Sequence, residues 1–219
     1  MKKSGTRVRA GEFVALKHAR SLGVPVPIAH EYIPEEQTIF MEHVEDDCRE
    51  DVWPNMSEDE KISIAQQLGR AVTLMRSSRQ TETLIGAIDG LARDCRRYSD
   101  YAGGPFADEE SFNASVLDLY TSCPQPVRDA LSSKMRSDHS IRFTHADLSP
   151  RNIIVKDGKI QGIIDWEFSG WYPEYWEYVK FYECKTKCKD WKNFAPYIFE
   201  EAYGEELIIQ QAILRWQRP

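Results

Sequence analysis

Along several stretches of the chain, apolar residues recur every three or four positions, a spacing that is typical of one face of a helix. The clearest stretch runs from Ile64 to Met75 and follows Ser57, which begins a capping box that ends at Glu60. We therefore expect a long helix there, with its apolar face in the core. The same spacing predicts a helix at residues 12–22, and a Pro-Glu start predicts one at residues 173–185. Further helices are expected at residues 109–120, 126–135, 191–202 and 205–216.

Shorter runs rich in β-branched residues predict strands. Residues 28–33 and 38–43 fit two strands joined by a turn, and residues 141–144 fit a third. Asp157-Gly158 separates the apolar runs 153–155 and 160–164, and this dipeptide is a strong signal for a β-hairpin. Because residues 45–54 are acidic and irregular, we expect two parts. Residues 1–45 would form a small lobe of one helix and short antiparallel strands, and residues 46–219 a larger, mainly helical lobe that contains the hairpin.

The candidate chemistry gathers around this hairpin. His145 and Asp147 lie in a loop after strand 141–144, Asn152 follows five residues after the aspartate, and Asp165 ends the second apolar run. Because a hairpin brings its ends together, Asn152 and Asp165 should lie side by side, and both offer the hard oxygen atoms that Mg²⁺ prefers. Asp147 would orient the hydroxyl of an acceptor, while His145 braces the loop. Phosphoryl transfer from a nucleotide needs this set of groups.

On these residues, the segment 143–180 resembles the aminoglycoside phosphotransferase and choline kinase-like family, and residues 165–177 are similar to its fungal branch. The resemblance implies a protein kinase-like, two-lobed α+β fold with a truncated N-terminal lobe, a mainly helical C-terminal lobe and a cleft between them. It also implies a small-molecule kinase that uses ATP and Mg²⁺ to phosphorylate a hydroxyl. Ala146 stands where the family usually has glycine, so we expect a slight shift of the loop backbone.

The resemblance also assigns nucleotide-binding residues. Lys3 and Glu12 match the spacing of the family's lysine, which contacts the phosphates, and of the glutamate that holds it. Glu42 and Val44 lie where the hinge between the lobes would bind adenine through backbone groups. The family places a glycine-containing phosphate loop before the lysine, and the chain begins beside Lys3, so we expect that loop to be missing. A truncated reading frame, a minimal kinase with weak ATP binding and a kinase-derived protein with another task would each explain this.

The segment after Asp165 is rich in aromatic and acidic residues, and such a set suits a cationic amine. Glu167, Trp171 and Glu174 are candidates for contact with a small-molecule acceptor, Glu167 first because it lies nearest the predicted metal ligands. A second interpretation, which we favour for most of these residues, is that the rings fill the core and the acids stabilise a helix N-terminus.

Composition narrows the range of partners. A net charge of −7 without a basic stripe argues against nucleic-acid binding, and no apolar run has the length of a membrane helix. Five cysteines without tight spacing indicate free thiols, so a cytoplasmic location is expected. A pseudokinase or kinase-derived binding protein, and a kinase-fold enzyme that catalyses a non-phosphoryl reaction, are the alternatives to a kinase. No feature of the sequence indicates an oligomeric state.

Overall fold

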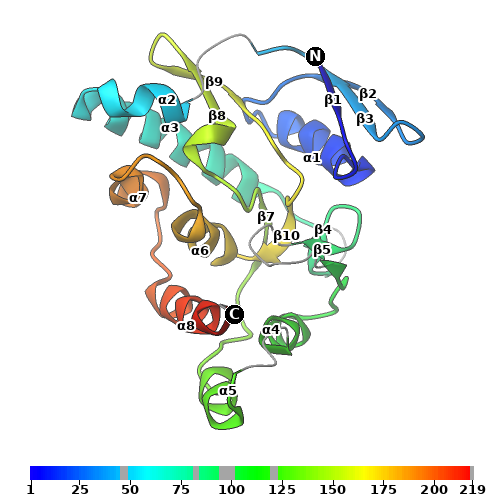
Figure 1. The fold of residues 1–219 in the computed structure, drawn as a ribbon, viewed down its shortest axis with the longest axis vertical. Coiled ribbons are helices and arrows are strands. Elements are labelled where there is room, and N and C mark those ends of the chain that lie inside the picture. Colours follow the sequence, from blue (N-terminus) through cyan, green and yellow to red (C-terminus); the bar gives the residue numbers. More distant parts are fainter. Residues whose placement is uncertain (45–48, 81–83, 94–101, 119–122, 218–219) are drawn as a thin grey trace.

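An antiparallel sheet of three strands, in the order β1-β3-β2, forms the N-terminal part of the protein (Figure 1). The computed structural model describes residues 1–44, 49–80, 84–93, 102–118 and 123–217. The strands are β1 (Lys2–Ser4), β2 (Ala29–Ile33) and β3 (Thr38–Met41), and α1 (Ala10–Ser21) packs against β2. The helix and the two strands that the sequence predicts here are confirmed, whereas the boundary between the two predicted lobes falls at residues 45–48, outside the described residues.

Helices dominate the remainder of the molecule. They are α2 (Arg49–Val52), α3 (Glu58–Ser77), α4 (Glu109–Asp118), α5 (Gln125–Ser132), α6 (Trp176–Glu183), α7 (Ala195–Ile198) and α8 (Gly204–Leu214), with the 3-10 helices η1 (Trp53–Asn55), η2 (Pro150–Asn152), η3 (Trp191–Phe194) and η4 (Arg215–Gln217).

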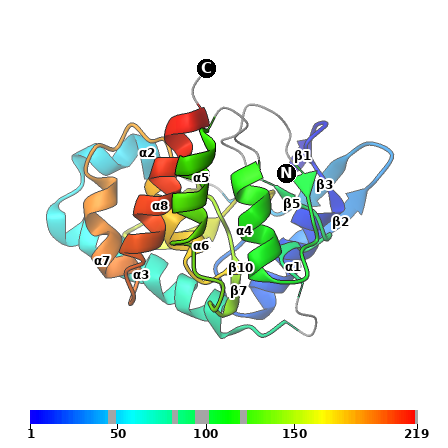
Figure 2. The same ribbon diagram turned by 90° about the horizontal axis from the view of Figure 1, so that it is seen from below.

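The helix α3, with 20 residues, packs against α7, β7 and β9. Its capping box forms as predicted, since the backbone N–H of Ser57 donates to Glu60 (2.8 Å) and the Ser57 hydroxyl accepts from the Glu60 backbone (3.4 Å). The helices α4, α5 and α8 lie at the lower end of the molecule in Figure 1, and Figure 2, seen from below, shows them side by side. Within the described residues, no helix is long and apolar enough to cross a membrane.

Two further sheets and a hairpin accompany these helices. The strands β4 (Gly86–Ala87), β10 (Gly170–Pro173) and β7 (Ile141–Thr144) form one antiparallel sheet in that order, and β5 (Ala92–Arg93) pairs with β6 (Ala102–Gly103). The predicted hairpin is present as β8 (Ile153–Lys156) and β9 (Lys159–Ile163). Its turn residues Asp157 and Gly158 have φ of +48° and +71°, the left-handed pair that a tight hairpin turn requires.

The prediction of a helix from residue 173 is wrong at its start. Gly170–Pro173 forms β10 instead, and α6 begins only at Trp176. The strand depends on Gly170, because a Cβ atom there would lie 2.2 Å from the backbone oxygen of Gly86 on β4. Most of the aromatic residues after Asp165 belong to the core, with Trp166 fully buried and Trp176 3% exposed. The helix predicted at 191–202 is also divided, into η3 and the short α7.

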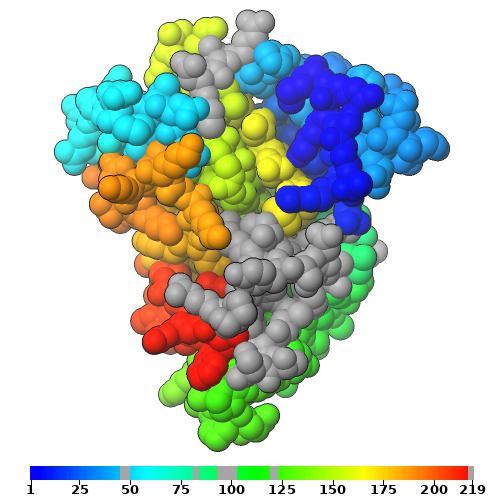
Figure 3. All heavy atoms as spheres, viewed as in Figure 1, coloured from blue at the N-terminus to red at the C-terminus, as the bar shows by residue number. Residues whose placement is uncertain are grey.

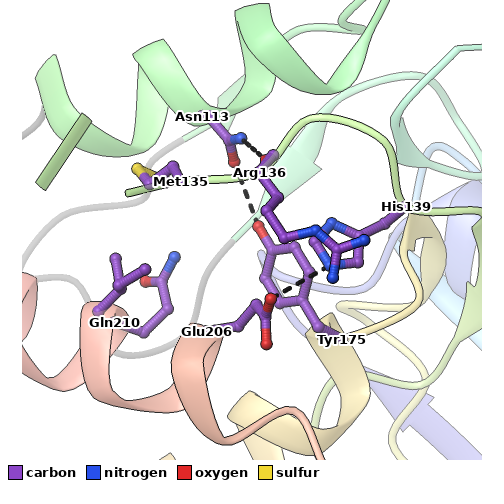
Figure 4. Close-up of a pocket in the computed structure, with 8 residues that line it drawn as sticks. Asn113, Met135, Arg136, His139, Tyr175, Glu206 and Gln210 are labelled. Atoms are coloured by element: carbon purple, nitrogen blue, oxygen red, sulfur yellow. Dashed lines mark hydrogen bonds and ion pairs between the residues drawn. The ribbon is translucent and has the colours of Figure 1, made fainter. Parts of the chain in front are cut away.

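A buried polar cluster ties the helices at the lower end together. His139 precedes β7, and its side chain lies between Glu109 of α4 (2.7 Å) and Glu206 of α8 (3.3 Å). A small pocket lies beside this cluster, and Figure 4 shows that Tyr175 lines it together with His139 and Glu206. The Tyr175 hydroxyl donates to Asn113 at 3.2 Å. Burial raises the pKa of Tyr175 well above its usual value. These contacts fix the start of β7, which leads from this cluster towards the candidate site.

Candidate active site

Buried hydrogen bonds hold the loop that follows β7 at its first turn. The carboxylate of Glu177, on the first turn of α6, accepts one hydrogen bond from the backbone N–H of His145 (2.6 Å) and one from that of Ala146 (3.0 Å). Ala146 has φ of +66°, a left-handed conformation that costs a residue with a side chain roughly 1–2 kcal/mol. Burial raises the pKa of Glu177 to about 7, against the opposing effect of the two N–H donors.

His145 connects this loop to the segment that follows β9. Its Nδ1 accepts a hydrogen bond from the backbone N–H of Asp147 (3.1 Å), so Nε2 carries the proton that is donated to the carbonyl of Ile164 (3.1 Å). Burial lowers the pKa of His145, which favours the same neutral ring. The bracing hydrogen bonds expected from the sequence are therefore present, and they orient the backbone on both sides of the site.

Asp147 lies in the bend of the loop, with its side chain only 3% exposed. Its Oδ2 accepts hydrogen bonds from Nδ2 of Asn152 (3.0 Å) and from the guanidinium of Arg151 (2.5 Å). The same Asn152 nitrogen donates to the backbone oxygen of Asp147 at 2.9 Å. Asp147 and Asn152 are thus in direct contact.

Asn152 and Asp165 lie at the same end of the hairpin, as the pattern predicts. The backbone N–H of Ile164 donates to the carbonyl of Asn152 (2.9 Å), so Asp165 is one residue beyond this pair. Asp165 has φ of +66°, which turns the chain out of the strand. In Figure 3 the segment after β9 (yellow) lies against the N-terminal residues (blue).

Lys3 connects the N-terminal sheet to Asp165 at the end of the hairpin. It lies opposite Ile39 in the pairing of β1 with β3. Its Nζ is 2.6 Å from Oε1 of Glu12 and 2.9 Å from Oδ1 of Asp165, a residue 162 positions away. Burial lowers the pKa of Lys3, but the two carboxylates raise it more, so the net pKa is above its usual value and the side chain is a cation. Burial raises the pKa of Glu12, whose Oε2 is buried without a hydrogen-bond partner among the described residues.

The chemistry of Asn152 and Asp165 fits Mg²⁺. Because Nδ2 of Asn152 donates to Asp147, its carbonyl oxygen is the atom that can act as a ligand. Together with a carboxylate oxygen of Asp165, this gives two hard oxygen ligands, as expected for an ion that keeps several waters and binds mainly substrate phosphates. No group of three or more His, Cys, Asp or Glu side chains in the described part of the chain is arranged to hold a metal ion by itself.

Comparison with known proteins identifies the family of the chain. The model of the phosphotransferase enzyme family matches residues 6–208. The chain belongs to this family. No curated protein sequence matches the chain significantly.

Solved structures show that this phosphotransferase family member shares a fold with small-molecule kinases. Aminoglycoside phosphotransferase APH(4)-Ia matches with a TM-score of 0.63 at 15% identity, over 94% of this chain and 72% of that one. A choline/ethanolamine kinase family protein from Mesorhizobium loti matches with a TM-score of 0.58 at 17% identity, over 99% and 70% of the two chains. One related structure is a ternary complex of APH(2″)-IIa with streptomycin and ATP (TM-score 0.61, 12% identity, 93% of this chain and 69% of that one). At these identities the likeness establishes the kinase-like fold.

The three residues predicted to contact the acceptor are not brought together. Glu167 lies beside the site, and its carboxylate forms an ion pair with Arg7 of the N-terminal segment. Trp171 is a buried β10 residue whose ring packs against Phe143 (5.5 Å between centroids). Glu174 lies at the opposite end of β7 from the loop, where its backbone N–H donates to the carbonyl of Ser140 at 2.9 Å. Glu167 alone of the three is near the predicted metal ligands.

The two residues predicted to form a hinge, Glu42 and Val44, follow β3 of the N-terminal sheet. The backbone N–H of Glu42 donates to the carbonyl of Ile28 (2.8 Å), and the Glu42 carboxylate accepts from the Ile28 backbone (3.2 Å). The Val44 side chain lies against Gly162 of β9, where an added Cβ atom would be 3.3 Å from it. Their role in adenine binding stays a prediction.

The sequence pattern misses two residues that hold the loop in place. Arg151 lies four positions after Asp147, a spacing visible in the sequence, but the direction of its side chain depends on the turn of η2. Glu177 lies within the aromatic run, where its acidity indicates a helix N-terminus rather than a contact with the loop. Both positions become meaningful only once the loop and α6 are packed together.

Proposed function

We propose that the protein is an ATP- and Mg²⁺-dependent kinase that transfers the γ-phosphoryl group of ATP to a hydroxyl of a small molecule. One observation carries the proposal: the ammonium group of Lys3 lies 2.9 Å from Asp165, at the end of the hairpin where Asn152 contacts Asp147 of the preceding loop. A cation for phosphates, two oxygen ligands for a metal and a carboxylate for an alcohol therefore converge from opposite ends of the chain.

Each residue has a distinct role in this proposal. Lys3, held by Glu12, would bind phosphate oxygens as a point charge, and Asn152 and Asp165 would hold magnesium. Bound magnesium would neutralise charge on the phosphates. Asp147 would accept the hydrogen bond of the acceptor hydroxyl and aim its oxygen at the γ-phosphorus. The hydroxyl oxygen of the acceptor forms a bond to the γ-phosphorus while the bond from the γ-phosphorus to the bridging oxygen of ADP breaks. The proton of the hydroxyl passes to Asp147.

Substitution of Asp147 tests the mechanism. We expect Asp147→Asn to lower turnover by roughly 10²–10⁴-fold, because the amide keeps the size of the side chain but loses the proton acceptor. Product mass, which rises by one phosphoryl group, identifies the reaction. Asp157→Asn is the matched control, because Asp157 is exposed in the hairpin turn and asparagine tolerates its positive φ. Full activity of Asp147→Asn would refute the mechanism.

Nucleotide binding is tested separately from catalysis. We expect MgATP to raise the melting temperature of both the wild type and Asp147→Asn, since Asp147 contacts the acceptor rather than the nucleotide. An acceptor screen should contain cationic acceptors, such as amino sugars and simple amino alcohols, and also neutral sugars. Glu167 is the one predicted contact residue near the site that could bind a cationic acceptor, but its carboxylate already pairs with Arg7, so both classes have to be tested. Binding of MgATP without transfer to any acceptor, or to water, would instead favour a non-catalytic binding protein.

A further inference from the structure

The guanidinium of Arg151 bridges the proposed catalytic carboxylate of Asp147 and the backbone carbonyl of Lys185. One terminal nitrogen donates to Oδ2 of Asp147 at 2.5 Å, and the other donates to the backbone carbonyl of Lys185 at 2.9 Å. Because a guanidinium is planar and rigid, two partners on two of its nitrogens define the orientation of the whole group. Arg151 is thus oriented by the protein before any substrate arrives.

The turn of the loop directs this side chain towards Asp147. The backbone N–H of Ser149 donates to the carbonyl of Asp147 (2.8 Å), and that of Asn152 donates to the carbonyl of Ser149 (3.0 Å). These bonds fold residues 147–152 back on themselves, so Asp147 and Arg151 form an ion pair four residues apart. The pair is asymmetric, since the Asp147 side chain is 3% exposed and that of Arg151 is 39% exposed.

Both the Arg151 and the Asn152 hydrogen bonds end on the same carboxylate oxygen, Oδ2. A carboxylate held at one oxygen by two donors from different directions has little freedom to rotate about its Cβ–Cγ bond. Rotation would move the second oxygen away from a bound alcohol, and in-line transfer tolerates little misplacement, since a shift of about 1 Å costs on the order of 100-fold in rate.

We propose that Arg151 is a positioning residue that clamps Oδ2 of Asp147, so that Oδ1 faces the acceptor hydroxyl. This inference rests on the proposed kinase function and adds a residue to it. Arginine suits the role better than lysine, because a single ammonium at the end of a flexible stem cannot hold the Lys185 carbonyl and the carboxylate in one plane. The clamp acts through Asp147, so its loss should change the turnover rate rather than nucleotide binding.

The test compares Arg151→Ala and Arg151→Lys with the wild type, using the acceptor found in the screen or, without one, phosphate release from MgATP. We expect kcat to fall about 10- to 100-fold in Arg151→Ala, with KM for ATP changed less than about 2-fold, and an intermediate loss in Arg151→Lys. Guanidinium chloride at low millimolar concentration should restore part of the kcat of Arg151→Ala and none of that of Asp147→Asn. Arg128→Ala is the matched control, because Arg128 forms a similar ion pair with Asp118 at 2.6 Å between α4 and α5.

Each outcome separates the inference from the function it rests on. If Arg151→Ala lowers the melting temperature but leaves kcat per folded molecule unchanged, Arg151 only supports the fold and the inference is wrong. The inference is also wrong if kcat falls and guanidinium restores none of it. In both cases the kinase function stands. A parallel loss of activity in Arg128→Ala would equally overturn it. A folded wild type that transfers phosphoryl groups neither to the screened alcohols nor to water overturns the proposed function, and the inference with it.

Discussion

Replacement of Glu177 by glutamine should change how the stability of the protein depends on pH. The carboxyl group of Glu177 is 3% exposed, and burial raises its pKa from 4.5 to about 7. Between these two values, the unfolded chain ionises at this position while the folded protein keeps the proton. Ionisation therefore stabilises the unfolded state, and the contribution of Glu177 to stability is complete below pH 4.5 and lost as the pH rises to about 7.

The size of the effect follows from the shift. A difference of about 2.5 pKa units corresponds to about 3 kcal/mol of unfolding free energy. Glu177→Gln cannot ionise, and its amide oxygen still accepts one of the two backbone N–H groups at His145 and Ala146. The difference in unfolding free energy, wild type minus variant, should consequently fall by about 3 kcal/mol between pH 4.5 and pH 7 and stay constant above.

Denaturant unfolding at half-unit pH steps from about 4 to about 8 measures this difference. Subtraction of the variant removes the titration of all other groups, as long as they behave alike in both proteins. Glu110→Gln is the control, because Glu110 is an exposed residue of α4, and its difference from the wild type should show no such fall. Parallel curves for the wild type and Glu177→Gln across this range would mean that the two N–H donors balance burial and that folding leaves the pKa of Glu177 unchanged.

Three further substitutions test the packing that supports the site. Lys3→Met should destabilise the protein by about 3 kcal/mol in denaturant unfolding, because it leaves the buried Glu12 carboxylate unpaired. The double variant with Glu12→Gln should recover part of this loss. If the effects of the two substitutions simply add, Lys3 and Glu12 are not coupled. Ser57→Ala should cost about 1 kcal/mol by removing the capping box of α3, and an unchanged unfolding midpoint would refute that role. Ala146→Gly should stabilise by about 1 kcal/mol, because glycine adopts φ of +66° without strain, whereas Ala71→Gly inside α3 should destabilise; the same sign for both would contradict the argument.

Features that depend on a few neighbouring residues are the ones the sequence predicts well. The capping box at Ser57 and the hairpin turn at Asp157 and Gly158 each form from residues within a few positions of one another. The spacing of Asp147, Asn152 and Asp165 is local in the same sense, since one loop and one hairpin determine it. For this reason most of the candidate site can be recognised in the sequence pattern alone.

Features that depend on distant partners are missed. Pro173 and Glu174 have the sequence of a helix start, yet Pro173 ends the strand β10, because β7 and β4 lie on either side of that strand. Proline is tolerated there because it is the last residue of the strand. The family resemblance predicts the pairing of Lys3 with Glu12, which is observed, but the pairing of β1 with β3 and the contact of Lys3 with Asp165, 162 residues away, cannot be inferred from the local pattern.

The helix α6 shows why the supports of an active site are hard to recognise in a sequence. A helix buried on most sides is expected to be apolar, and Val179 and Phe181 meet that expectation with no exposed surface. Glu177 does not, although it is 3% exposed, and the two N–H donors of the loop at residues 145–146 offset part of the cost of its burial. Just past the other end of α6, the carbonyl of Lys185 holds Arg151. Glu177 on α6 and the segment just past the end of α6 therefore hold the proposed catalytic loop at its backbone and, through Arg151, at the Asp147 carboxylate, and the acid buried on α6 serves the position of Asp147 at a cost to the stability of the core.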